Sequence, residues 1–356
     1  MGHAGANTVQ ASSAAGATHP TGGFVPLRIK RVIHETTDAV SLVLDVPPSS
    51  AELFGYQAGQ FITLRVQIAG REHRRCYSMS SSPATGEDLR ITVKRDRDGV
   101  VSNWLNDYAE VGDRIQAAPP AGRFVLRDSG RELVAFAGGS GITPVFSLIR
   151  SALASGTRPV SLFYANRNRG SVIFAEPLAL LAERHPHRLV IQHHLDEHEG
   201  VVQPAQVESF CAPAGDAEFY ICGPGPFMDT VEAAVLKSGA SADRVHLERF
   251  QVAEIPVPAP DAAASVTEHV TFELDRRKTV VPYRSGNTLL QTARLGGLRA
   301  PSSCETGSCG TCMAMVVEGS ARMLNNDALD EAEVADGWVL TCQSLPTSPT
   351  VTVIYE

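Results

Sequence analysis

Four cysteines near the end of the chain are spaced for a particular chemistry. They follow the pattern C-x4-C-x2-C with a distant fourth member: Cys304, Cys309, Cys312 and Cys342. This is the ligand spacing of plant-type [2Fe–2S] clusters. Three thiolates must converge from one tight loop, and Gly307 and Gly310 can take the cramped backbone angles that such a loop needs. The spacing therefore predicts a [2Fe–2S] cluster held by these four cysteines.

A structural zinc site and disulfides are the alternative uses of such cysteines. Zinc sites favour C-x2-C pairs in both halves, whereas here only Cys309 and Cys312 are so spaced. Disulfides are disfavoured because the chain has seven cysteines, an odd number, and no pattern of a secretory signal. The pattern favours the iron–sulfur interpretation over both.

Two segments in the first third of the chain can bind a flat, anionic cofactor. Arg75, Tyr77 and Ser78 share one predicted strand end. There a guanidinium suits a phosphate, and a tyrosine ring can stack on a flat group. Gly99 and Ser102 open a predicted helix, whose first amides can hold an anion. Together the two segments predict one cofactor site.

Two glycine turns in the middle of the chain have a similar capacity. Residues 138–144, Gly-Gly-Ser-Gly-Ile-Thr-Pro, connect a buried strand to an apolar-striped helix, with Thr143 as the expected N-cap. Residues 222–228, Cys-Gly-Pro-Gly-Pro-Phe-Met, follow a second predicted strand. Such turns cradle phosphates, and ligands of parallel sheets bind outside the carboxyl ends of the strands. The two turns therefore predict a nucleotide site.

The first pair of segments resembles a known family. Arg75-x-Tyr77-Ser78 followed by Gly99-x-x-Ser102 is similar to the FAD-binding pair of the ferredoxin–NADP reductase superfamily. The resemblance implies that Arg75 and Ser102 bind the pyrophosphate region of FAD. It also implies that Tyr77 and Ser78 contact the isoalloxazine, with Ser78 near its N5 atom.

The glycine turns are similar to the pyridine-nucleotide motifs of the same superfamily. The resemblance implies that Thr143 and Cys222 flank the nicotinamide, and that Glu248 and Phe250 match an acidic-x-aromatic segment near the flavin. The implied catalytic residues are Ser78, Thr143, Cys222 and Glu248. The implied nucleotide-binding residues also include Gly139, Gly141 and Gly223.

The elements that must position these residues suggest three domains. Short alternating strands over residues 25–128 predict an antiparallel β-barrel for the flavin, and strand–helix alternation over 129–250 predicts a parallel α/β domain for the nucleotide. Residues 266–356 resemble an α+β, β-grasp ferredoxin. A proline-rich linker over 251–265 and a disordered tail over 1–24 complete the expected organisation.

Composition excludes some classes of function. The chain has 356 residues and a net charge of −8, which argues against nucleic acid as a partner. No apolar run is long enough to span a bilayer, so we expect no membrane partner and a cytoplasmic location.

The choice between NADH and NADPH stays open in the sequence. Arg167 and Arg169 follow a strand where adenosine specificity is often decided, and two arginines suit the 2′-phosphate of NADPH. The family resemblance implies NADH instead.

Residues 193–199, His-His-Leu-Asp-Glu-His-Glu, are expected to form a polar loop rather than a metal site, because they lack an H-x-x-x-H helix pattern.

These modules predict an electron path from NAD(P)H through FAD to the cluster and on to a separate oxygenase. The domain order is similar to the reductases of Rieske-type 3-ketosteroid 9α-hydroxylases and of phenylacetyl-CoA epoxidase, a di-iron system. A non-catalytic iron–sulfur redox sensor is the alternative from a different class.

A segment before Cys342 is acidic and carries Asp327, Asp330, Glu331, Glu333 and Asp336. It can steer a basic partner to the cluster, or it can simply begin a solvated helix.

Overall fold

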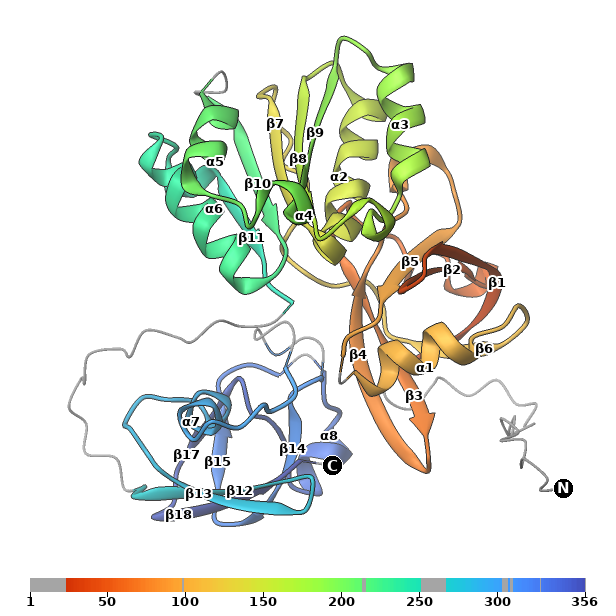
Figure 1. The fold of residues 1–356 in the computed structure, drawn as a ribbon. Coiled ribbons are helices and arrows are strands. Elements are labelled where there is room, and N and C mark those ends of the chain that lie inside the picture. The colour runs from red at the N-terminus through yellow and green to blue at the C-terminus, as the bar shows by residue number, and fades with distance from the viewer. Residues whose placement is uncertain are drawn as a thin grey trace, which may run out of the picture.

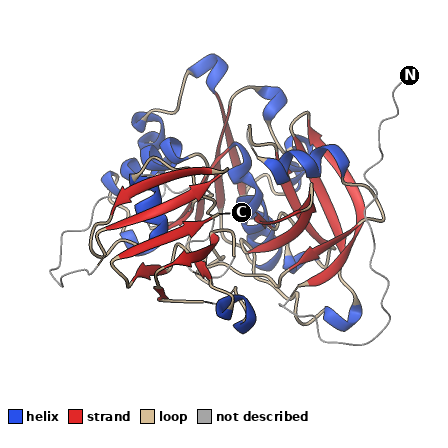
Figure 2. Ribbon diagram, turned by 90° about the horizontal axis from the view of Figure 1, so that it is seen from below, coloured by secondary structure: helices blue, strands red, loops and turns tan. Residues whose placement is uncertain are grey.

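The computed structural model describes residues 24–97, 99–212, 216–250, 267–302, 307, 310–326 and 328–355. They form an N-terminal barrel, a central α/β domain and a C-terminal domain (Figure 1). Seen from below, the strands of the barrel and of the C-terminal domain lie on neighbouring sides of the molecule (Figure 2). The predicted linker, the predicted tail up to residue 23, Cys304 and Cys309 lie outside the described residues.

The barrel consists of six antiparallel strands in the order β4-β3-β6-β1-β2-β5. An isolated bridge pairs Met79, the residue after β4, with Ile91 of β5, so the two outer strands meet and the sheet closes as predicted. Its elements are β1 (Val25–Thr36), β2 (Ala39–Asp45), η1 (Pro48–Ser50), β3 (Phe61–Ile68), β4 (Arg71–Ser78), η2 (Pro83–Thr85), β5 (Leu89–Lys94), α1 (Val100–Tyr108) and β6 (Arg114–Ala117).

Alternating apolar residues explain the barrel. Leu42 and Leu44 of β2, Ile62 and Leu64 of β3, and Ile91 of β5 are all buried in one core. Their period of two places every second side chain on the inner face of the strand. Phe24, placed in the tail by the sequence analysis, is buried beneath the guanidinium of Arg65, which lies 4.4 Å from its ring centroid.

The central domain is a five-stranded parallel sheet in the order β11-β10-β7-β8-β9, with helices on both faces (Figure 1). Two cores, one on each face, bury the strands on both sides, as parallel sheets require. The elements are β7 (Leu133–Gly138), η3 (Gly139–Gly141), α2 (Ile142–Ser155), β8 (Val160–Asn166), η4 (Arg169–Ser171), α3 (Ala175–Arg184), β9 (Leu189–Leu195), α4 (Asp196–Glu199), α5 (Pro204–Cys211), β10 (Glu218–Cys222), α6 (Gly225–Lys237), η5 (Ala242–Arg244) and β11 (Val245–Glu248).

Two local predictions in this domain are wrong. Thr143 is not the N-cap of its helix, because the turn η3 runs directly into α2 and Gly141 takes that position. Residues 193–199 are not a loop: they end strand β9 and form the short helix α4. His194 is buried and its Nε2 atom lies 2.8 Å from the carbonyl oxygen of Gly200, which makes it a core residue.

The C-terminal domain has the mixed sheet expected of the ferredoxin resemblance. Its order is β13-β12-β18-β14-β16, with β12 parallel to β18, and β15 and β17 form a separate pair. The elements are β12 (His269–Leu274), β13 (Arg277–Pro282), α7 (Leu289–Leu295), β14 (Met313–Glu318), β15 (Ala321–Met323), α8 (Glu331–Ala335), β16 (Trp338–Leu340), β17 (Ser344–Pro346) and β18 (Thr350–Ile354). No helix among the described residues is both long and apolar enough to cross a bilayer.

Candidate active site

A cavity of about 330 Å³ lies where the three domains meet. The barrel lines it with the end of β4 and the start of α1, and the central domain with its two glycine turns. Ser302 contributes from the C-terminal domain. Nine of the residues singled out from the sequence line this one cavity: Arg75, Tyr77, Ser78, Gly99, Ser102, Thr143, Gly223, Glu248 and Phe250.

Ser78 is the most informative of these residues. Its Oγ atom is buried and has no hydrogen-bond partner among the described residues. A buried hydroxyl without a partner is unfavourable, so it points to a group that the cavity is built to receive. Next to it, burial raises the pKa of Tyr77 well above its ordinary value, so the phenol stays protonated at neutral pH.

The segment before α1 is held by Ser102. The Oγ of Ser102 accepts a 3.1 Å hydrogen bond from the amide of Asp96 and donates one of 3.2 Å to the carbonyl of Gly99. A Cβ on Gly99 would lie 2.3 Å from that Oγ, so only glycine fits there. Arg75 Nη1 donates to the carbonyl of Arg74 at 2.7 Å. These bonds fix Asp96, Gly99 and Ser102 relative to one another, and all three residues line the cavity.

The two glycine turns of the central domain press against each other. A Cβ on Gly141 would lie 2.1 Å from the carbonyl oxygen of Cys222 and 2.7 Å from the amide nitrogen of Gly223. Thr143 Oγ1 donates to the carbonyl of Ser140 at 2.9 Å and so orients the start of α2. The carboxyl ends of β7 and β10 are thereby joined into one wall of the cavity.

Gly139, Gly141 and Cys222 stand behind that wall instead of lining it. The side chain of Cys222 is fully buried, and burial, followed by the negative charge of Glu248, raises its pKa well above the ordinary value. A thiol in this state is protonated at neutral pH and is a poor nucleophile. Its expected role next to the nicotinamide stays a prediction.

Sequence reasoning missed the cavity residues Lys94, Phe61, Thr92 and Ser302, and named Ser140 only as part of the 138–144 turn. Lys94 ends the alternating strand β5 with its Nζ atom 3.8 Å from Asp38 Oδ2. Burial lowers its pKa, and the charge of Asp38 partly opposes this effect. Its place at the end of the strand, a few residues before the predicted Gly99–Ser102 segment, was a usable signal.

Known proteins match each domain in turn. The chain matches the oxidoreductase FAD-binding domain over residues 26–126, the oxidoreductase NAD-binding domain over 136–233 and the 2Fe-2S iron-sulfur cluster binding domain over 272–347. It is 39% identical to the ferredoxin reductase component of 3-ketosteroid-9-alpha-monooxygenase from Rhodococcus rhodochrous, over 91% of this chain and 95% of that protein. The chain belongs to this family of oxygenase reductases.

Further comparisons agree with that assignment. The reductase is 32% identical to a component of the 1,2-phenylacetyl-CoA epoxidase of Escherichia coli K12, over 94% of this chain and 98% of that one. The structure of phthalate dioxygenase reductase, described as modular for electron transfer from pyridine nucleotides to [2Fe-2S], covers 94% of this chain with a TM-score of 0.59 and 26% identity. The protein is thus the reductase component of a multicomponent oxygenase, and the enzyme prediction is confirmed.

The residues present fit both prosthetic groups of the family. The unpartnered Ser78 hydroxyl and the glycine-lined cavity suit FAD. For the cluster, Cys312 and Cys342 are buried cysteines on adjoining segments, because Thr341 donates both its amide and its hydroxyl to the carbonyl of Cys312, at 3.1 and 2.8 Å. Within the described part of the loop, Gly307 and Gly310 have φ angles of 88° and 68°, as the spacing predicted.

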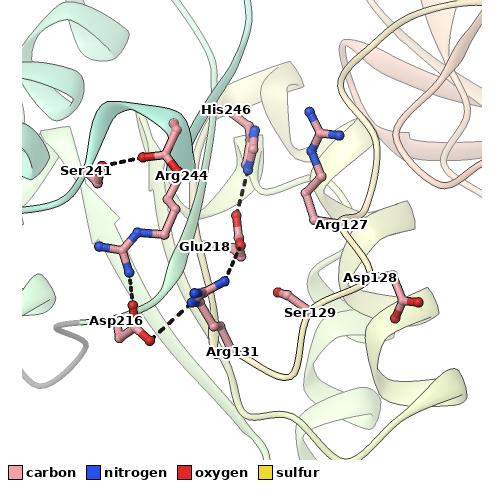
Figure 3. Close-up of a pocket in the computed structure, with 10 residues that line it drawn as sticks. Arg127, Asp128, Ser129, Arg131, Asp216, Glu218, Ser241, Arg244 and His246 are labelled. Atoms are coloured by element: carbon pink, nitrogen blue, oxygen red, sulfur yellow. Dashed lines mark hydrogen bonds and ion pairs between the residues drawn. The ribbon is translucent and has the colours of Figure 1, made fainter.

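A second cavity, of about 660 Å³, lies at the opposite end of the central sheet (Figure 3). It is found at the amino ends of β7, β10 and β11, away from the glycine turns. Its charges largely satisfy one another: His246 Nε2 lies 2.8 Å from Glu218 Oε2, and Arg131 and Arg244 both contact Asp216. This network ties three strand ends together, which is a structural role.

Proposed function

We propose that this reductase supplies electrons to a Rieske-type oxygenase that hydroxylates a 3-ketosteroid. The observation that carries the proposal is the 39% identity to 3-ketosteroid-9-alpha-monooxygenase reductase components across nearly the full chain. Identity falls to 32% for the phenylacetyl-CoA epoxidase component and 30% for the glycine betaine monooxygenase reductase of Pseudomonas aeruginosa. The net charge of −8 and the odd number of cysteines, seven, fit a cytoplasmic protein without a nucleic-acid or membrane partner.

The cavity residues support the electron path on which this function depends. When bound, FAD accepts two electrons from a reduced nicotinamide and passes them on singly. Thr143 and Gly223 shape the nucleotide wall, Glu248 and Phe250 stand at its edge, and Tyr77 with Ser78 forms the facing wall of the barrel. Walls from two domains hold two flat groups against each other and exclude water between them.

NADH is the proposed electron donor. Arg167, one of the two arginines that suited a 2′-phosphate in the sequence, has its Nη2 atom 2.9 Å from Asp38 Oδ2 of the barrel, and Arg169 stays exposed. The Arg167 side chain is 68% exposed, so the pair weakens its attraction for a phosphate without cancelling it, and the carboxylate of Asp38 repels a phosphate. This pairing supports NADH over NADPH.

The test combines the purified reductase with candidate oxygenases, NADH and substrate, and measures the hydroxylated product. We expect coupled turnover with a Rieske-type 3-ketosteroid 9α-oxygenase and little with the di-iron oxygenase of phenylacetyl-CoA epoxidation. Equal or better turnover with the di-iron enzyme would overturn the steroid assignment. A measurement of NADH oxidation without any oxygenase controls for uncoupled reaction with oxygen.

A further inference from the structure

The barrel and the C-terminal domain are joined by a partly buried ion pair. Arg74 of β4 places its Nη2 atom 2.5 Å from Oε1 of Glu333 in α8, and the two side chains are only 6% and 23% exposed. These residues are 259 positions apart in the chain. A charge-assisted hydrogen bond in this environment is screened much less by water and salt than a surface pair.

The pair lies beside the two segments that carry the redox groups. Cys76, between Arg75 and Tyr77 on the flavin strand, has its Sγ atom 3.7 Å from Oγ1 of Thr311. Thr311 directly precedes the cluster ligand Cys312. A Cβ on Gly310 would lie 3.3 Å from Cδ of Arg74, so the cysteine loop rests directly on that side chain.

A third contact comes from the other side of the same loop. Ser302, the last described residue before the first cysteine of the motif, lines the flavin cavity. Its Oγ atom accepts a 2.8 Å hydrogen bond from Nη2 of Arg294, which lies in the last turn of α7. Gly310 and Thr311 therefore contact the barrel, and Ser302 lines the cavity.

Glu333 is held in position for its contact with Arg74. Its Oε2 atom accepts from the amide of Asp330 at 3.0 Å, and the Asp330 carboxylate accepts from the amide of Glu333 at 2.8 Å. This capping box fixes the first turn of α8 and leaves Oε1 for Arg74. A side chain that is already ordered loses little entropy when it pairs.

We infer that Arg74 and Glu333 are a positioning pair that seats the cysteine loop against the flavin strand, so that electrons cross from flavin to cluster near the Cys76–Thr311 contact. The inference rests on the reductase function proposed above, but not on which oxygenase is served. Electrons move singly from the reduced flavin to the oxidised cluster, and the proton that the flavin gained as hydride leaves to solvent once both electrons have gone. If the pair opens, the loop leaves the flavin strand and the crossing slows.

The test is anaerobic stopped-flow absorption of the FAD- and cluster-loaded reductase mixed with NADH. In Glu333→Gln, which keeps a side chain able to complete the capping box, we expect flavin reduction at the wild-type rate and cluster reduction slowed about tenfold. Glu331→Gln removes the same charge from the same helix and should behave as wild type. Arg74→Gln should slow cluster reduction as Glu333→Gln does, whereas Arg74→Lys, which retains the charge, should recover most of the rate.

Hydrogen exchange supplies a readout independent of activity. Amides of residues 71–78 and 310–318 should exchange faster in Glu333→Gln than in Glu331→Gln, while those of β7 and β8 should not change. Wild-type cluster reduction and wild-type exchange in Glu333→Gln would overturn the positioning pair. Failure of the wild-type protein to reduce its cluster with NADH would overturn the reductase function itself, which separates the two outcomes.

Discussion

At the end of β4, the hydroxyl of Ser78 is buried and has no hydrogen-bond partner among the described residues. Two residues further on, the Oγ of Ser80 is also buried but lies 2.8 Å from Oγ1 of Thr92. The same side chain on the same segment is thus satisfied by the protein at one position and left for a ligand at the other. This difference makes Ser78 a binding residue in our interpretation.

Replacing Ser78 by alanine should affect the apoprotein and the FAD-bound protein differently. Removing an unpaired buried hydroxyl leaves the melting temperature of the apoprotein unchanged or higher. Removing a hydrogen bond to bound FAD weakens its affinity by about 1 kcal/mol, roughly fivefold. Thermal melting and fluorescence titration with FAD measure the two effects.

Ser80→Ala is the matched control for this experiment. It removes the bonds to Thr92 and from Nε of Arg90, so it should destabilise the apoprotein by about 1 kcal/mol. Thr92, which lines the cavity, keeps its bond to Ser41, so FAD affinity should be unchanged. Equal destabilisation of the apoprotein by both variants, with no loss of FAD affinity in Ser78→Ala, would contradict the assignment.

Asp38 is expected to contribute to nucleotide preference through Arg167. In Asp38→Asn the guanidinium of Arg167 is released and a negative charge near the strand end is lost, so the ratio of kcat/KM for NADPH to that for NADH should rise about threefold. Steady-state kinetics with both nucleotides measure it. Asp88→Asn, which breaks the exposed pair with Lys30 on the same barrel, should not change the ratio. An unchanged ratio in Asp38→Asn would argue against this role.

At the scale of elements, the nucleotide wall depends on how closely two strand–turn–helix units approach. β7 with α2 and β10 with α6 are adjacent in the sheet, and their turns meet at Gly141 and Cys222. The parallel strands bring the two turns together at one edge of the sheet. The backbone atoms of the turns lie so close there that no side chain fits between them. The glycine is therefore required by packing between elements, as well as by the local turn.

Gly141→Ala should separate these two turns. The added Cβ would meet backbone atoms 2.1 and 2.7 Å away, which cannot move independently, so we expect a destabilisation of about 1–3 kcal/mol and weaker NADH binding. FAD retention should persist because the flavin strand is in the barrel. Gly225→Ala, in the second turn with open space around it, should be neutral or stabilising. A stable Gly141→Ala protein with normal NADH affinity would show that the turns can separate freely.

At the scale of the whole molecule, the acidic helix α8 has a role inside the chain. Glu333 contacts the barrel and Asp330 caps the helix, whereas Glu331 and Asp336 stay exposed. Acids in the first turn also suit the helix dipole. Of these four acids, the exposed Glu331 and Asp336 are available to attract a basic partner.

Removing one cluster ligand should separate the two halves of the electron path. In Cys342→Ser we expect loss of the cluster's iron and of reduction of the oxygenase, with NADH-dependent ferricyanide reduction through the flavin retained. Iron analysis and the two assays measure this. Cys211→Ala alters a buried thiol of α5 and should keep both activities. Loss of both activities in folded, FAD-loaded Cys342→Ser would contradict the serial path.

Local patterns in the amino-acid sequence predicted the three modules and nine residues that line the cavity. The cysteine spacing, the Arg75–Ser78 segment and the glycine turns are local patterns, so each carries its chemistry within a few residues. Strand alternation was enough to predict the barrel because inner and outer positions alternate along the chain. Local patterns failed where context decides: Thr143 does not cap its helix, and His194 is buried by packing.

The contacts between the modules could not be predicted from the sequence and are seen in the tertiary structure alone. Three contacts join the domains, each between residues far apart in the sequence. They are Arg74 with Glu333, Asp38 with Arg167, and Cys76 with Thr311, separated by 259, 129 and 235 positions. Each of these side chains taken alone is an ordinary charged or polar residue in the sequence. Its partner depends on the packing of whole domains, which no spacing records, and that packing places the cysteine loop beside the flavin strand.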